Sequence, residues 1–199
     1  MMAKYSREAL IKLLKKAVAA APAGLQYAIG GATALEEHGY KRYTQDVDVF
    51  VLDQHLNSLM RVLTGVGLQV FAIQEPSHYA AKIPGDPEPE RRIDVRVAYS
   101  EPELSAVEHA FIGKEGLRVF DANLLAMVKF YAYDDSGDVR HAFDLVAMHR
   151  RGMFDVNLVR SMMEAVDPER VEKYDTLIKS FQASGRPGPR PSKRLPPPR

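Results

Sequence analysis

Apolar residues near the N-terminus recur at the spacing of an amphipathic helix. Leu10, Leu14 and Val18 fall on one face of a 3.6-residue repeat, with charged residues between them. Ser6 stands where a residue would cap this helix, and the Pro22-Ala23-Gly24 segment is expected to end it. The chain is therefore predicted to begin with a helix that packs on a core through a single face.

Between residues 25 and 120 the pattern changes to short apolar runs, rich in β-branched and aromatic residues, that alternate with helical stretches. Strands are expected at 25–29, 45–52, 68–73, 78–83, 91–99 and 116–120, and helices at 32–39 and 53–65. From residue 121 the spacing is helical, with helices expected at 122–133, 137–152, 156–166 and 169–181. This order predicts an α/β domain with a helical C-terminal part.

The same pattern sets the expected domain boundaries. One domain is predicted over residues 1–182, with a core at 25–120 and a helical part at 121–182. The last thirteen residues hold six prolines, and from Ser184 onward there are five basic residues and no acidic one. Because such a segment has little to bury, residues 183–199 are predicted to be a disordered Pro/Arg-rich tail.

The composition narrows the class of protein. The 199 residues are 46% hydrophobic and 27% charged, which is typical of a globular protein, and the absence of cysteine excludes disulfides and thiolate zinc sites. The net charge of +1 predicts no general attraction to nucleic acid. No apolar run approaches transmembrane length and the N-terminus lacks the order of a secretory signal, so a cytoplasmic protein without a membrane segment is expected.

Two aspartates interrupt the apolar strand expected at 45–52. Alternate residues of a strand share a face, so Asp46 and Asp48 should point together while Val47 and Val49 point into the core. Carboxylates so close repel each other unless a positive charge lies between them, and Mg²⁺ or Mn²⁺ is the natural partner of such oxygens. A solvent-facing edge strand is the alternative for an isolated Asp-x-Asp.

A third carboxylate changes the balance between these alternatives. Asp94 lies in the strand expected at 91–99, between the apolar residues Ile93 and Val95. If the two strands are neighbours, Asp46, Asp48 and Asp94 form a ligand set for two metal ions.

Adjacent glycines precede the first pair of aspartates. Gly30 and Gly31 come between an expected strand and an expected helix, where backbone N–H groups are free and a missing side chain lets phosphate approach. For a glycine pair by itself, a simple tight turn between strand and helix is the favoured alternative. The order of strand, glycine pair, helix and Asp-x-Asp strand favours phosphate binding.

The segment "GGATALEEHGYKRYTQDVDVFV", residues 30–51, resembles the signature of the nucleotidyltransferase superfamily that includes DNA polymerase β. That signature is a glycine pair, a spacer and an Asp-x-Asp bounded by apolar residues, and here fourteen residues separate Gly31 from Asp46. The Gly-Gly-x-Ala-Leu and Thr-x-Asp-Val-Asp patterns are most similar to AbiEii-type nucleotidyltransferases, some of which are toxins of toxin–antitoxin systems. The resemblance implies a mixed β-sheet flanked by helices.

A second, looser patch of similarity lies downstream. "LLAMVKFYAY" and "DVRHAFDLVAM" resemble the family's lysine helix and the Arg-x3-Asp-Leu helix that follows it. The resemblance implies that Lys129 contacts the triphosphate and that Asp144 is a structural or catalytic acid. The alternatives are an exposed helix lysine and an i,i+4 ion pair of Arg140 with Asp144.

The resemblance also implies an activity: transfer of a nucleoside monophosphate from an NTP to an acceptor hydroxyl, with pyrophosphate released. Asp46 and Asp48 would hold Mg²⁺ or Mn²⁺, and Asp94 would be a further ligand and the base. Gly30, Gly31 and Lys129 would bind the triphosphate, and the 41–45 segment would add Thr44 and Arg42.

Several acceptors and roles stay open from the sequence. The acceptor could be tRNA or another RNA, a protein hydroxyl, or a small molecule as in the antibiotic-modifying nucleotidyltransferases. The role could be that of a toxin with a cognate antitoxin, or of a non-catalytic, antitoxin-like nucleotide-binding protein.

Overall fold

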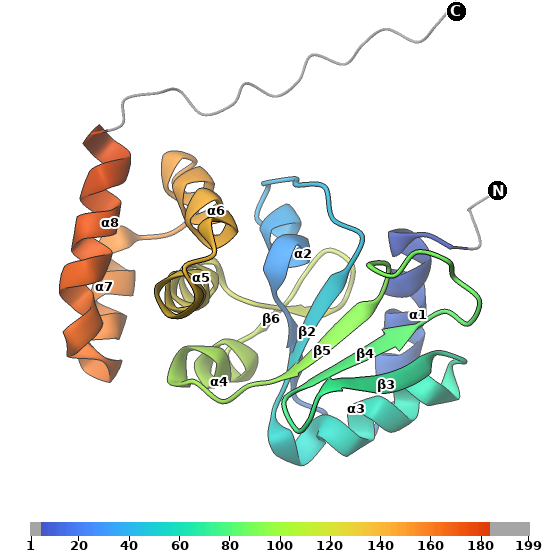
Figure 1. Ribbon diagram of the computed structural model, residues 1–199. Helices are drawn as coiled ribbons and strands as arrows, with labels where there is room; N and C mark the ends of the chain where they lie inside the picture. Colours follow the sequence, from blue (N-terminus) through green and yellow to red (C-terminus); the bar gives the residue numbers. More distant parts are fainter. Residues whose placement is uncertain (1–4, 184–199) are drawn as a thin grey trace, which may run out of the picture. The chain divides into compact units, whose positions relative to one another are not determined.

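The computed structural model describes residues 5–183 of the chain (Figure 1). By its internal contacts the chain divides within helix α5 (Ala122–Ser136) into two compact units. The first unit ends at Val128 and the second begins at Lys129. Each unit buries apolar side chains of its own.

A seven-stranded mixed sheet forms the centre of the first unit, in the order β3-β4-β5-β2-β1-β7-β6. The strands are β1 (Tyr27–Ile29), β2 (Val47–Val51), β3 (Gln69–Gln74), β4 (His78–Lys82), β5 (Ile93–Val97), β6 (Phe111–Ile112) and β7 (Arg118–Val119). Strand β2 pairs antiparallel with β1 and parallel with β5, while β3, β4 and β5 form an antiparallel series. The parallel pair β2 and β5 is therefore brought together by a connection that includes a helix and two strands.

Two long helices of the first unit bury the apolar side of β2. Helices α1 (Arg7–Ala19) and α3 (Asp53–Gly65) contact each other and β2. Their buried residues are Leu10, Leu14 and Ala17 from α1 and Leu56, Leu59 and Leu63 from α3. The side chains of Val47, Val49 and Val51 are 0% exposed, which fixes the face of β2 that turns away from solvent. Two shorter helices, α2 (Gly31–Glu37) and α4 (Glu101–Glu108), also contact β2.

The second unit is helical. After the end of α5 it contains α6 (Val139–Arg150), α7 (Val156–Val166), a 3₁₀ turn at Pro168–Arg170 and α8 (Val171–Ala183). Phe130 and Tyr174 meet edge to face with ring centroids 5.4 Å apart, and Leu145, Met148, Val159 and Met163 are buried. Asp155 caps α7 as expected, accepting the backbone N–H groups of Asn157 and Leu158.

The predicted fold class, α/β with a mixed sheet flanked by helices, is confirmed. Helix α4 was not expected, although Ser100 and Glu103 form a capping box in which the Glu103 carboxylate accepts the Ser100 N–H at 3.2 Å. The strand expected at 116–120 is only the two-residue β7, and its partner β6 was not expected because two residues carry no readable alternation.

Some expectations stay predictions. The domain boundaries stay predictions, and the tail expected at 183–199 lies outside the described residues from position 184 onward. Among residues 5–183, no helix has both the length and the apolar character needed to cross a bilayer.

Candidate functional site

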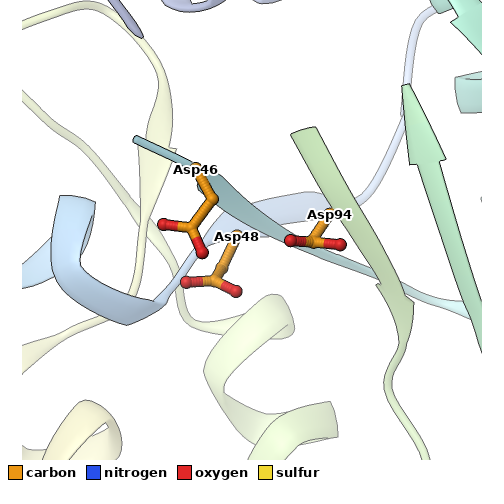
Figure 2. Close-up of side chains that lie close together, drawn as sticks. All are labelled: Asp46, Asp48 and Asp94. Atoms are coloured by element: carbon orange, nitrogen blue, oxygen red, sulfur yellow. The ribbon is translucent and has the colours of Figure 1, made fainter. Parts of the chain in front are cut away.

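Three carboxylates converge where β2 and β5 run side by side. The parallel register places Asp48 directly opposite Asp94, and Asp46 comes immediately before β2. One oxygen from each of the three residues lies within 4.8 Å of the others. Figure 2 shows Asp46 and Asp48 projecting from the same side of the chain with Asp94 beside them on β5. The predicted meeting of the three aspartates is thus present in the fold.

The alternation of β2 explains why the carboxylates share a face. Val47 and Val49 are fully buried on the side of α1 and α3, so the residues between and before them must point the opposite way. Asp46 and Asp48 are half-buried, whereas Asp94 is 4% exposed. Burying three like charges together is costly unless donors or cations offset them.

Asp46 is held by the 41–45 segment, which directly precedes it. The Thr44 hydroxyl donates a hydrogen bond to Asp46 Oδ1, two residues away. The expected contact of Thr44 with nucleotide stays a prediction. Arg42, also half-buried, lies in the same 41–45 segment.

Asp48 is packed against the glycine pair. Gly31 has φ +54°, and a Cβ added there would lie 1.7 Å from Asp48 Oδ2. A Cβ on Gly30 would lie 2.7 Å from the Phe50 ring, and the Gly30 N–H donates to the Asp48 carbonyl at 3.0 Å. The glycines are therefore required for close approach of Asp48 and Phe50. Their predicted contact with phosphate stays a prediction.

Asp94 is held by two donors. Nε2 of His78 lies 2.9 Å from Asp94 Oδ1, and Arg92 Nε lies 3.0 Å and 3.2 Å from the two oxygens. Sequence reasoning named neither residue. Arg92 could have been found, because it stands two residues before Asp94 and so shares its face of the strand. His78 could not, because its nearness depends on the pairing of β4 with β5.

The donor set fits a hard divalent cation. All three side chains offer carboxylate oxygens, which Mg²⁺ and Mn²⁺ prefer, and their closest oxygens are near enough to share ions. No sulfur or imidazole ligand belongs to this cluster within the described residues. Asp46 and Asp48 would hold the ions, with Asp94 completing the set from β5.

Lys129 and Asp144 form a buried ion pair in the second unit. Lys129 Nζ lies 2.7 Å from Asp144 Oδ2, and the two residues are 4% and 2% exposed. The pKa of nearby His141 is lowered, mainly by burial and then by the positive charge of Lys129. Asp144 therefore has a structural partner, while the contact of Lys129 with triphosphate stays a prediction.

Arg140 also has a partner within the second unit. Its guanidinium donates to Asp138, the residue that caps α6, at 2.6 Å. This hydrogen bond lowers the pKa of Asp138 to about 2. The alternative of an i,i+4 ion pair of Arg140 with Asp144 stays a prediction.

A cavity of about 750 Å³, lined mostly by charged and polar residues, adjoins the segment that leads to Asp46. It lies among the start of α1, α2 and the 41–45 segment, and its walls include Thr33, Thr44 and Gln45. Six cationic and four glutamate side chains line it, so its charge is mixed with an excess of positive groups. Tyr43, on the same segment, is 84% exposed.

Comparison with known proteins identifies the fold. No protein-family model and no curated protein matches the sequence. A candidate nucleotidyltransferase from Helicobacter pylori is 20% identical, with a TM-score of 0.53 and coverage of 89% of this chain and 80% of that chain. JHP933 from Helicobacter pylori is 19% identical, with a TM-score of 0.52 and coverage of 89% and 78%.

The antibiotic-resistance factor ANT(2'')-Ia has a similar fold, at 17% sequence identity and a TM-score of 0.51, with 89% of this chain and 95% of that chain covered. At these identities the likeness shows a shared fold. The chain has the fold of nucleotidyltransferases.

Substitution of Gly31 tests the contact with Asp48. Gly31→Ala should lose about 1–2 kcal/mol of unfolding free energy for its left-handed backbone, and Gly39→Ala, whose φ is +90° with nothing within 4 Å, should lose a similar amount. Only Gly31→Ala should also weaken Mn²⁺ binding, by at least about tenfold, because its methyl group displaces the Asp48 carboxylate. Urea denaturation measures the unfolding free energy, and a titration with Mn²⁺ followed by electron paramagnetic resonance measures the affinity for the metal. Equal Mn²⁺ affinity in both variants would contradict this account.

Proposed function

We propose that this protein is a metal-dependent nucleotidyltransferase that moves a nucleoside monophosphate from an NTP to an acceptor hydroxyl. The observation that carries the proposal is the cluster of Asp46, Asp48 and Asp94 within 4.8 Å, at the parallel pair β2 and β5 of a nucleotidyltransferase fold. A strand that only faced solvent would not need a third carboxylate in register beside the first two.

In the proposed reaction the acceptor oxygen attacks the α-phosphorus, and the bond from that phosphorus to the bridging oxygen of the β-phosphate breaks. Pyrophosphate leaves, and Asp94 takes the proton of the acceptor hydroxyl. Bound Mg²⁺ or Mn²⁺ would neutralise the phosphate oxygens and the developing charge on the leaving group.

The other residues of the candidate site contribute by holding side chains in place or by binding the nucleotide. Thr44 donates to Asp46, and Gly31 leaves the space that Asp48 occupies. Side chains held in place before the reaction need less reorganisation during it. Gly30, Gly31, Thr44 and Lys129 are proposed to bind the triphosphate. Arg42, in the 41–45 segment, is a further candidate. Arg140 and Asp144 are proposed to support the lysine helix.

We propose a macromolecular acceptor, RNA or protein, with RNA favoured by the surface near Asp46. Lys41 and Arg42 directly precede the exposed Tyr43, and the adjoining cavity has more cationic than acidic side chains. Aromatic rings beside cations suit unpaired bases and their phosphates. A small-molecule acceptor is the second candidate, since the antibiotic-resistance factor ANT(2'')-Ia has the same fold over nearly its whole length.

Binding of nucleotide provides the direct test. Calorimetry with each of the four NTPs and Mg²⁺ should show binding by the wild type and a loss of at least about tenfold in Asp46→Asn/Asp48→Asn, because the carboxylates that hold the metal are neutralised. Asp53→Asn, an exposed aspartate at the start of α3, is the matched control and should bind as the wild type does. Absence of binding by every protein would rule out the enzymatic proposal.

The acceptor is identified by following the label from α-³²P-NTPs added to the protein and a cell extract. Label should enter a fraction that ribonuclease degrades, and Asp94→Asn should abolish the transfer because the hydroxyl proton has no acceptor. Label in a protease-sensitive fraction would indicate a protein acceptor. Label only in small molecules would support the second candidate instead.

We also propose an AbiEii-type toxin role, with a cognate antitoxin as partner. Induced expression of the wild type should arrest growth, and Asp46→Asn should remove the arrest because toxicity requires transfer. Colony counts after induction measure this effect, with Asp53→Asn as control. Wild-type expression that leaves growth unchanged, or protects cells from a co-expressed toxin, would instead favour the antitoxin-like alternative.

A further inference from the structure

One face of the hairpin formed by β4 and β5 carries a histidine next to the candidate metal site. His78 is the first residue of β4, and its side chain is 16% exposed. Strand β4 lies on the side of β5 opposite β2, so His78 reaches Asp94 from the side away from Asp46 and Asp48. The histidine therefore contacts the carboxylate without entering the cluster itself.

The strand register explains how His78 reaches Asp94. Ala80 is the residue directly opposite Asp94, while His78 lies two residues earlier on the same face of β4. Because alanine carries only a methyl group, the imidazole can lean diagonally across it to the carboxylate. Since an ionised carboxylate only accepts, Nε2 of His78 carries the hydrogen in this 2.9 Å bond.

Arg92 supplies a second, competing donor. Its Nε is 3.0 Å from Asp94 Oδ1 and 3.2 Å from Oδ2, so it contacts both oxygens. His78 adds a donor to Oδ1 from the neighbouring strand β4. Because the two donors reach Asp94 from different parts of the chain, together they restrain rotation of its carboxylate.

We infer that His78 is a positioning residue that keeps the Asp94 carboxylate turned toward Asp46 and Asp48. In Figure 2 one oxygen of Asp94 is directed at the other two aspartates, and the opposite oxygen faces the side from which β4 approaches. Loss of the His78 bond leaves Arg92 as the donor that determines the direction of Asp94. This inference rests on the proposed function, because it concerns the third ligand of the proposed metal centre.

Three substitutions at His78 test the role. His78→Gln keeps an amide N–H at the reach of Nε2, His78→Asn places the amide one bond closer to the backbone, and His78→Leu removes the donor. Loss of a partner that orients a metal ligand weakens metal binding by about 10–100-fold. We therefore expect His78→Asn and His78→Leu to bind Mn²⁺ at least about tenfold more weakly than the wild type, with His78→Gln within about twofold of it.

Mn²⁺ binding is measured on the full chain without nucleotide by electron paramagnetic resonance, with thermal unfolding of each variant as the check on folding. His55→Leu on α3 is the control for loss of a partly exposed histidine and should bind Mn²⁺ as the wild type does. Asn is polar, so its variant keeps the test valid if His78→Leu does not fold.

The outcomes separate this inference from the function on which it rests. If the wild type binds no Mn²⁺, the metal-dependent function itself is wrong. If the wild type binds Mn²⁺ and His78→Asn and His78→Leu bind equally well, His78 has no positioning role. If His78→Gln loses affinity as much as His78→Leu does, the hydrogen bond is not the cause and the inference is overturned.

Discussion

Electrostatic repulsion among three carboxylates is the constraint around which the first unit is arranged. Strands β2 and β5 are locked in parallel register by backbone hydrogen bonds and by buried valines and isoleucine on their far side. That register holds Asp48 beside Asp94, with Asp46 just outside the strand. The apolar face thus stabilises an arrangement that the charges alone would oppose.

Each carboxylate is restrained by different residues, and these residues lie at different separations from it along the chain. Asp46 accepts from Thr44, two residues earlier. Asp48 lies against Gly31, which has no side chain and a left-handed backbone. Asp94 accepts from Arg92, two residues earlier and just before β5, and from His78 on the neighbouring strand β4. Restraint of this kind suits chemistry that depends on position and charge.

The second unit buries opposite charges as an ion pair, whereas the first unit brings three like charges together. Lys129 and Asp144 are almost completely buried and neutralise each other at 2.7 Å. Removing one partner of such a buried pair strongly destabilises the folded protein, because the other charge stays buried without compensation. Asp144 therefore has a structural role as the partner of Lys129. The sequence offered an ordinary exposed lysine as the alternative for Lys129, and its burial excludes that alternative.

The sequence alone determined the local features of the protein. Period-two alternation placed Asp46 and Asp48 on the face of β2 that lies opposite the face of the buried valines. Helical spacing, with Ser6 and Asp155 as caps, located α1 and α7. The tertiary structure decided which distant residues meet: Asp94 with Asp48, His78 with Asp94, Asp48 with Gly31, and Lys129 with Asp144. Alternation depends only on neighbouring residues, whereas these contacts depend on strand order, register and packing, which no short stretch of sequence contains.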